Sequence, residues 1–157
     1  MIALVRPDGS VSVAADDLLI PNGTVITADG KRLIIAESYG ERLTQFDINA
    51  DGTLANRRLF AAIPGHLPDG ICIDAENAIW VASCAAHAAI RVLEGGTITD
   101  TVPLAGESNT YACMLGGADR RDLYLCVADS FDPTKTRDLR SGRIDVARVT
   151  VPGAGWP

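Results

Sequence analysis

"PNGTVITADGKRLIIAES", residues 21–38, and "PDGICIDAENAIWVAS", residues 68–83, are two versions of one sequence pattern. Each version opens with proline, an Asx residue and glycine. It then runs through a short apolar segment and a polar turn to a second apolar segment. Asn22 and Asp69 hold the same position in the two versions. A pattern that recurs after roughly 40–50 residues indicates a repeat architecture.

The apolar residues of these repeats alternate with a period of two, which is typical of strands. In "RLTQFDI", residues 42–48, Thr44, Phe46 and Ile48 share one face, and "AIRVLE" and "GTITDTV" alternate similarly. Glycine-containing turn signals separate the runs at residues 7–9, 28–30, 51–52 and 95–96. Such turns join antiparallel neighbours. We expect "CAAHAAIRVL", residues 84–93, to be a loop followed by a strand.

Four short antiparallel strands per repeat predict an all-β protein, a β-propeller. We expect blades at residues 21–63, 64–105 and 106–157, the last with an irregular insertion. Residues 1–20 read as the two outer strands of an incomplete blade. About three and a half blades do not close a ring, because closed propellers need roughly four to eight. The sequence therefore predicts part of a longer protein or, as the alternative, a half-propeller that self-associates through its open blade edges.

Composition narrows the classes of function. The 157 residues are 47% hydrophobic and carry a net charge of -6. An acidic chain without a basic stripe argues against binding to nucleic acid or to anionic membranes. No apolar run approaches the roughly 20 residues of a membrane span, and the N-terminus does not resemble a signal peptide. We therefore predict a soluble, cytoplasmic protein.

The four cysteines, Cys72, Cys84, Cys113 and Cys126, show no C-x-x-C spacing. This argues against a structural zinc site. Three of them lie in apolar runs, so we expect small buried hydrophobic side chains there, with a disulfide or a reactive thiol as the alternative.

Asn22 and Asp69 are the main candidates for chemistry. The innermost strand of each blade lines the central channel of a propeller, and these two residues stand at the start of neighbouring inner strands. An amide oxygen and a carboxylate oxygen converging on one axis suit Ca²⁺, Mg²⁺ or Mn²⁺ and tolerate Zn²⁺. The alternative is that both are ordinary Asx-Gly turns, like the one in residues 6–9.

"LPDGICIDAENAIWVAS" resembles the signature of the regucalcin (senescence marker protein)/gluconolactonase family. "PNGTVITADGKRLIIAESYGERLTQFDINADGTLANRRLFA" and "YACMLGGADRRDLYLCVA" resemble further segments of that family. The resemblance implies a six-bladed propeller that binds one divalent cation in its central channel, and in many members hydrolyses lactones. It assigns metal-ligand roles to Asn22 and Asp69. A third ligand, a glutamate of the first blade, has no counterpart here. Asn77 replaces a usual glycine but tolerates the same left-handed turn.

The resemblance also implies a mechanism, in which the cation polarises the lactone carbonyl. Asp69 would be both a metal ligand and the base for the attacking water. His66, Thr110 and Tyr111 are candidate substrate-binding residues, although a solvated histidine and packed strand residues are the simpler interpretation. We expect structural roles for five further residues: Glu37, Ser38, Trp80, His87 and Asp129.

Three other functions stay open at this stage. The first is a different propeller enzyme, such as an esterase, although the proline-aspartate-glycine motif argues against it. The second is a non-catalytic cation-binding propeller. The third is an inactive remnant, which the absent glutamate favours. Fold alone does not decide among them.

Overall fold

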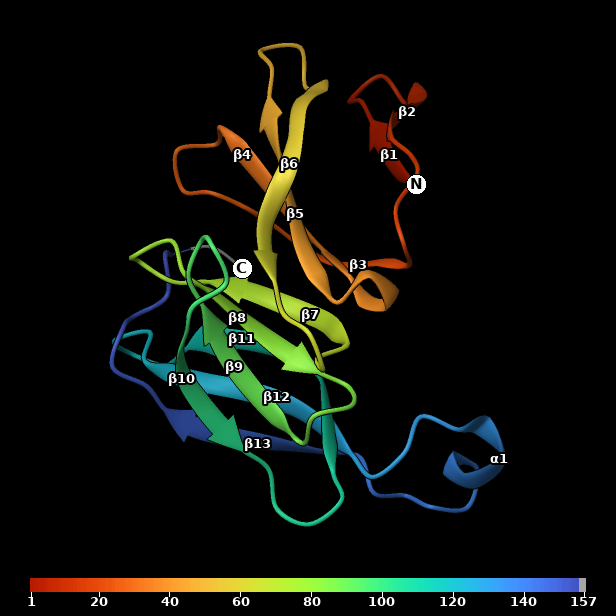
Figure 1. The fold of residues 1–157 in the computed structure, drawn as a ribbon, viewed down its shortest axis with the longest axis vertical. Helices are drawn as coiled ribbons and strands as arrows, with labels where there is room; N and C mark the ends of the chain where they lie inside the picture. Colours follow the sequence, from red (N-terminus) through yellow and green to blue (C-terminus); the bar gives the residue numbers. More distant parts are fainter. Residues whose placement is uncertain (156–157) are drawn as a thin grey trace.

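The computed structural model describes residues 1–155 as four antiparallel sheets (Figure 1). The first sheet has two strands, the next two have four each, and the last has three. The strands are β1 (Ile2–Val5), β2 (Val11–Ala15), β3 (Pro21–Ile26), β4 (Arg32–Glu37), β5 (Arg42–Ile48), β6 (Leu54–Ala62), β7 (Pro68–Ile73), β8 (Ile79–Ser83), β9 (Ala88–Val92), β10 (Ile98–Pro103), β11 (Asn109–Gly116), β12 (Asp122–Ala128) and β13 (Arg143–Arg148).

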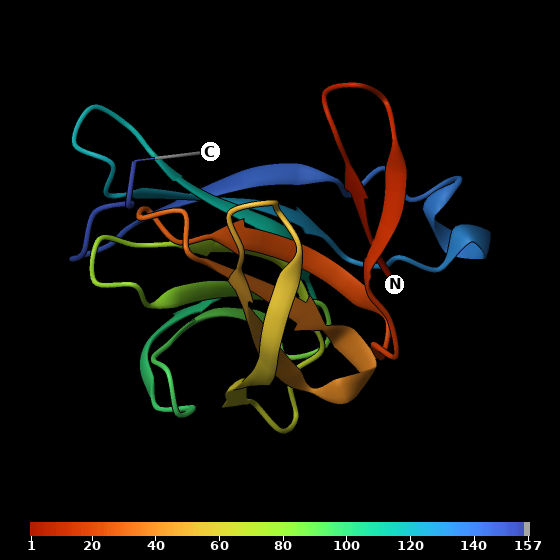
Figure 2. The ribbon, with the colours of Figure 1, turned by 90° about the horizontal axis from the view of Figure 1, so that it is seen from above.

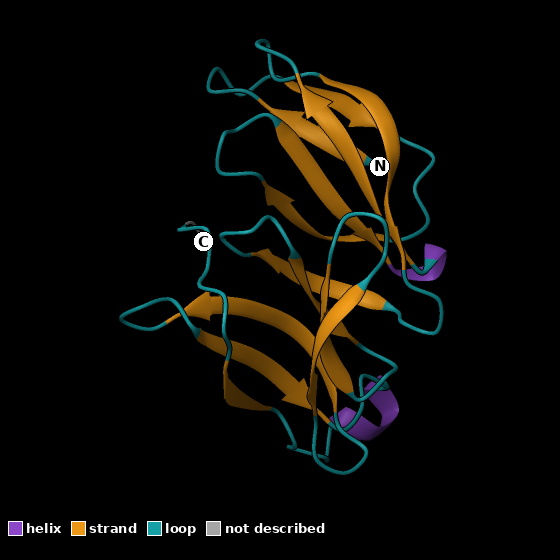
Figure 3. Ribbon diagram, turned by 60° about the vertical axis from the view of Figure 1, so that its left-hand side comes forward, coloured by secondary structure: helices purple, strands orange, loops and turns teal. Residues whose placement is uncertain are grey.

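Each larger sheet is a meander in which strands pair in chain order, starting from β3, β7 or β11. These three strands lie side by side, with β7 between β3 and β11. The sheets follow one another in space as they do in sequence (Figure 1). Figure 2 shows the same ribbon from above, and Figure 3 shows that strands and their connecting loops make up nearly all of the molecule. The predicted all-β architecture of propeller blades, about three and a half in number, is confirmed.

Two apolar clusters hold the blades together. One fills the space between the second and third sheets and includes Ile34, Leu43 and Val81. The other lies between the third and fourth sheets and includes Trp80 and Leu125. Successive side chains of β8 point to opposite clusters, as the period-two pattern requires. Burying each large side chain contributes roughly 1.5–3 kcal/mol, so the middle blade, buried on both faces, anchors its neighbours.

Several local predictions can be checked against the strands and turns. Residues 84–93 form a loop and then β9, as expected. Asn77 adopts a φ of 62°, which confirms the left-handed turn. Trp80 is 1% exposed and belongs to the blade core, also as expected. The insertion between β12 and β13 carries the short helix α1 (Pro133–Thr136), which projects away from the sheets (Figure 1).

The cysteines follow the prediction in part. Cys72 and Cys113 are buried, Cys84 is half-buried, and all four cysteines are free thiols. The prediction is wrong for Cys126, which is exposed. Its position in β12 alternates with the buried Leu125 and Val127, so its side chain points to the opposite, uncovered face.

Within residues 1–155 no helix is both long enough and apolar enough to cross a bilayer. The helical segments are α1 and one 3₁₀ turn, η1 (Ser38–Gly40).

Candidate functional site

The three inner strands approach one another closely at the ends where the candidate residues lie. A Cβ atom on Gly23 would lie 2.5 Å from the carbonyl oxygen of Asp69, and one on Gly70 would lie 2.7 Å from the Cα of Ala112. Neither glycine has a positive φ. Their role is to let β3, β7 and β11 touch, which aligns Asn22, Asp69 and Tyr111 on neighbouring strands.

A shift in the strand-pairing register interrupts each of the three inner strands beside its candidate residue. The pairing register shifts between Pro21 and Thr24 in β3, between Pro68 and Ile71 in β7, and between Thr110 and Ala112 in β11. A bulge leaves a residue unpaired and re-aims its side chain. Each bulge contains one of the three aligned residues, so the backbone itself presents them away from the regular ladder.

Asn22 is held by a serine that sequence reasoning treated as structural. The Asn22 amide nitrogen donates to Ser38 Oγ at 3.4 Å, and the buried Ser38 hydroxyl donates to the carbonyl oxygen of Pro68 at 2.6 Å. Ser38 therefore ties β3 to β7 and orients the amide. Because Nδ2 is turned to Ser38, Oδ1 is the atom left for a ligand.

Asp69 is a carboxylate without a cationic partner. Its side chain is half-buried and forms no ion pair with any residue of 1–155. Burial raises its pKa, and hydrogen bonding with the Asn22 amide acts in the opposite direction. A carboxylate in such surroundings gains free energy from any cation placed beside it.

Tyr111 and Thr110 separate into different roles. Thr110 is fully buried, and its hydroxyl lies 3.2 Å from the carbonyl oxygen of Cys126 and 3.3 Å from that of Ala112, within its own sheet. The Tyr111 ring packs edge-to-face on Phe131, with 6.3 Å between ring centroids. Burial raises the pKa of Tyr111, and Cys84 and Asp69 raise it further. Of the two, Tyr111 is the side chain whose pKa responds to the Asp69 charge.

Cys84 and His66 border the same region. The backbone N–H of Cys84 donates to Leu67, and burial raises the pKa of its thiol, with the Asp69 charge adding to the effect. His66 Nδ1 lies 3.4 Å from Ser83 Oγ. Burial lowers the pKa of His66 from 6.5, which keeps its imidazole neutral at pH 7.

The other acidic candidates have local partners. Glu37 is fully buried and binds Arg42 through two hydrogen bonds of 2.9 and 3.0 Å. Asp129 accepts a hydrogen bond from Ser108 at 2.6 Å and lies 3.8 Å from Arg143. His87 is exposed, and its Nδ1 lies 3.0 Å from the carbonyl oxygen of Ser108. These contacts are structural, as predicted.

The donor set at the site fits a hard divalent cation in part. Asn22 Oδ1 and the Asp69 carboxylate are oxygen ligands of the kind that Ca²⁺ and Mg²⁺ prefer. Residues 1–155 hold no group of three or more histidine, cysteine, aspartate or glutamate side chains that could enclose a metal. These two residues would supply one carboxylate and one amide, with other positions open to water or substrate.

A family model described as "SMP-30/Gluconolactonase/LRE-like region" matches residues 1–129. The chain belongs to this family. Among curated SMP-30/gluconolactonase relatives, regucalcin of Xenopus laevis is 34% identical over 144 residues, which cover 88% of the chain and 48% of regucalcin. Regucalcin of Oryctolagus cuniculus is 33% identical, over 81% of the chain and 44% of that protein. The chain thus spans about half the length of the curated relatives it matches.

Solved structures agree with the family and the fold. A luciferin-regenerating enzyme superposes with a TM-score of 0.81 and 24% identity, over 96% of the chain and 52% of that structure. A structure from Agrobacterium tumefaciens, titled as the calcium-binding protein regucalcin, has a TM-score of 0.77 and 22% identity, over 96% and 52%. A gluconolactonase from Xanthomonas campestris has a TM-score of 0.66 and 30% identity, over 78% and 40%.

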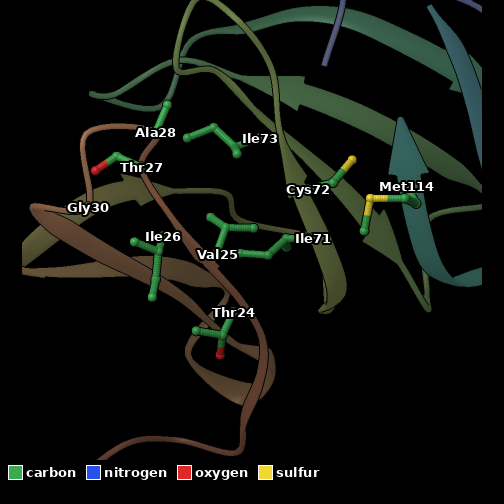
Figure 4. A pocket seen from close by; sticks show the side chains of 10 residues that line it. All are labelled: Thr24, Val25, Ile26, Thr27, Ala28, Gly30, Ile71, Cys72, Ile73 and Met114. Atoms are coloured by element: carbon green, nitrogen blue, oxygen red, sulfur yellow. The ribbon is translucent and has the colours of Figure 1, made fainter. Parts of the chain in front are cut away.

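A separate apolar cavity of about 520 Å³ lies further along the same inner strands (Figure 4). Its lining comes from β3, the turn that follows β3, β7 and β11, and contains no predicted site residue and no charged side chain: Thr24, Val25, Ile26, Thr27, Ala28, Gly30, Ile71, Cys72, Ile73 and Met114. The chemistry-bearing side chains and this cavity therefore occupy different stretches of the inner strands.

Sequence reasoning missed Ser38 and Cys84 as members of the site. Both follow the second strand of their blade, and each donates its backbone N–H to the residue just before the blade's first proline, Ile20 or Leu67. The two residues are therefore equivalent in neighbouring blades. Aligning the repeats by strand pairing, rather than by their letters, could have identified this pair.

Proposed function

We propose that the chain forms the metal-binding part of a divalent-cation-dependent lactone hydrolase. The observation that carries this proposal is Asp69, a half-buried carboxylate without a cationic partner in residues 1–155, placed beside the oriented amide of Asn22. Membership of the SMP-30/gluconolactonase family and the 30% identity to a gluconolactonase support the substrate class.

Each residue has a distinct task in the proposed reaction. Asn22 and Asp69 would hold Ca²⁺, Mg²⁺, Mn²⁺ or Zn²⁺ through oxygen atoms. A bound divalent cation would polarise the lactone carbonyl and stabilise the negative charge that develops on its oxygen. Asp69 would accept a proton from the attacking water, a task helped by the raised pKa that burial gives it. His66, Thr110 and Tyr111 remain the proposed substrate-binding set, with Tyr111 the best placed.

A non-catalytic cation-binding propeller is the second candidate. The absence of a three-residue acidic or imidazole cluster from residues 1–155 favours it, because two protein ligands hold a cation weakly.

Self-association through open edges and a cytoplasmic location stay predictions. Exposed apolar residues on β1, β2 and β13 support self-association: Val5, Val11, Val13, Ile144 and Val146.

The test measures proton release from a panel of aldonolactones, with aryl esters for comparison, in chelator and with each of the four cations. We expect cation-dependent lactone hydrolysis that Asp69→Asn abolishes. Asp100→Asn, an exposed change on β10, should keep the wild-type rate. Cation binding without turnover would favour the second candidate, and neither activity nor binding would contradict both.

A further inference from the structure

The Tyr111 hydroxyl is a buried polar atom without a hydrogen-bond partner. Within residues 1–155, two buried side-chain atoms lack a partner, Tyr111 Oη and Trp80 Nε1. Trp80 lies in the apolar cluster between sheets. Tyr111 lies among polar groups: Asp69 and Cys84 both raise its pKa. An unpaired buried hydroxyl costs free energy, so a native protein that keeps one calls for an explanation.

No neighbour in residues 1–155 satisfies this hydroxyl. Asn109 lies close enough to lower the pKa of Tyr111, but its side chain does not form a hydrogen bond with the Tyr111 hydroxyl. The ring is fixed from two sides. The bulge in β11 sets its direction, and Phe131, at the start of the insertion that carries α1, packs against it. The hydroxyl is therefore held in place and has no hydrogen-bond partner in residues 1–155.

The two proposed cation ligands offer little donation to negative charge on a substrate. Asn22 turns its amide nitrogen to Ser38, and an ionised Asp69 can only accept. The Tyr111 hydroxyl is a phenolic O–H, which can donate a hydrogen bond. Donors held in place before the reaction are what stabilise a developing oxyanion.

We propose that the Tyr111 hydroxyl donates a hydrogen bond to the carbonyl oxygen of the bound lactone as that oxygen becomes negative. This inference rests on the proposed function. In the reaction, the water oxygen bonds to the carbonyl carbon and its proton passes to Asp69. The ring C–O bond then breaks, and the ring oxygen takes up that proton. Tyr111 keeps its own proton throughout and contributes only the hydrogen bond.

Tyr111→Phe tests the proposal, because it removes the hydroxyl and keeps the ring on Phe131. We expect kcat to fall by about tenfold or more, with KM changed by no more than about twofold, since the bond strengthens only in the transition state. Melting temperature should stay equal or rise, because an unpaired hydroxyl is removed from the folded protein. Tyr124→Phe, on the uncovered face of β12, is the matched control and should change neither quantity.

An unchanged kcat in Tyr111→Phe, or a melting temperature several degrees lower, would overturn the proposal. If the wild type shows no turnover, the proposed function fails while this inference remains testable. The probe is then a cyclic phosphonate analogue of the lactone, whose tetrahedral, negatively charged centre mimics the transition state, measured by calorimetry. Weaker phosphonate binding by Tyr111→Phe but not by Tyr124→Phe supports the donor role. Equal binding, or no binding by the wild type, overturns it.

Discussion

Glu37 and Asp69 are two acidic side chains that are withdrawn from solvent, and they differ in the donors and cations that lie beside them. Glu37 has no exposed surface and accepts hydrogen bonds from Arg42, Thr44 and the backbone N–H of Leu19. Burial alone would raise the pKa of Glu37, but these donors lower it to about 2. Burial raises the pKa of Asp69, and hydrogen bonding with the Asn22 amide offsets this only in part.

The comparison separates two structural acids from the proposed cation ligand by their hydrogen-bond and charge partners rather than by how deeply they are buried. Asp74 repeats the Glu37 arrangement in the next blade, where it is fully buried and its Oδ2 lies 2.7 Å from Arg91 Nε. Both of these acids fasten strands within a blade. Asp69 stands at the start of an inner strand with its charge uncompensated by any residue in 1–155, which is the condition for binding a cation from solution.

The largest effect on stability should come from Glu37→Gln. The substitution keeps the shape but leaves the Arg42 guanidinium without its counter-charge, so we expect the free energy of unfolding to fall by about 3 kcal/mol. Urea denaturation measures this loss. Glu107→Gln, at an exposed position, should change it by less than about 0.5 kcal/mol. If Glu37→Gln is as stable as the wild type, Glu37 does not have the structural role described here.

Gly70→Ala should come next, at about 2 kcal/mol of destabilisation. The added methyl would lie 2.7 Å from the Cα of Ala112, so β7 and β11 must separate. That movement also displaces Asp69 from Tyr111, and we expect cation affinity to fall with stability. Gly142→Ala, where a methyl meets no atom within 4 Å, is the control. If Gly70→Ala is as stable as the control, the close approach of the inner strands is not required.

The pH dependence of the free energy of unfolding is a smaller effect, and its direction differs between Glu37 and Asp69. The pKa of Glu37 is about 2 when folded against an ordinary 4.5, so its contribution to stability is complete above pH 4.5 and is lost as pH falls towards 2. The pKa of Asp69 is raised above 3.8, so its ionisation destabilises the fold as pH rises through the folded pKa.

Unfolding free energies measured from pH 7 to pH 2 in chelator test this opposition. The deficit of Glu37→Gln relative to the wild type should shrink as pH falls. Asp69→Asn should exceed the wild type in stability at pH 7 and lose that advantage below about pH 4. Parallel pH profiles for the two variants would show that their environments do not differ in the way described.

Much of this architecture can be predicted from the sequence, because short-range patterns determine it. Alternating apolar residues and Asx-Gly turns predict the strands and hairpins, and the paired Pro-Asx-Gly segments predict equivalent inner strands. The turn at Asn77 could be predicted from its residue type, because asparagine tolerates the left-handed backbone region that this residue occupies. The exposure of Cys126 follows from the two-residue period of a strand, once the covered face of β12 is known. Every residue of β8 is buried because apolar clusters cover both faces of that strand.

The rest depends on contacts between blades, which no single repeat records. Ser38 orients Asn22 only because the neighbouring inner strand brings Pro68 alongside. The role of Gly70 lies in its distance to Ala112 rather than in its own backbone angles. The Tyr111 hydroxyl likewise can be recognised as lacking a hydrogen-bond partner in residues 1–155 only when the surrounding side chains are placed.

Thermal unfolding of the wild type and Asp69→Asn against divalent-cation concentration tests the central claim most directly. A cation held by Asp69 and Asn22 would stabilise the wild type by about 2.7 kcal/mol at a hundred times its dissociation constant. That corresponds to a rise in melting temperature of several degrees. We predict this rise for the wild type and for Asp100→Asn, and no rise for Asp69→Asn. Equal stabilisation of all three proteins would contradict the assignment of Asp69 as the cation ligand.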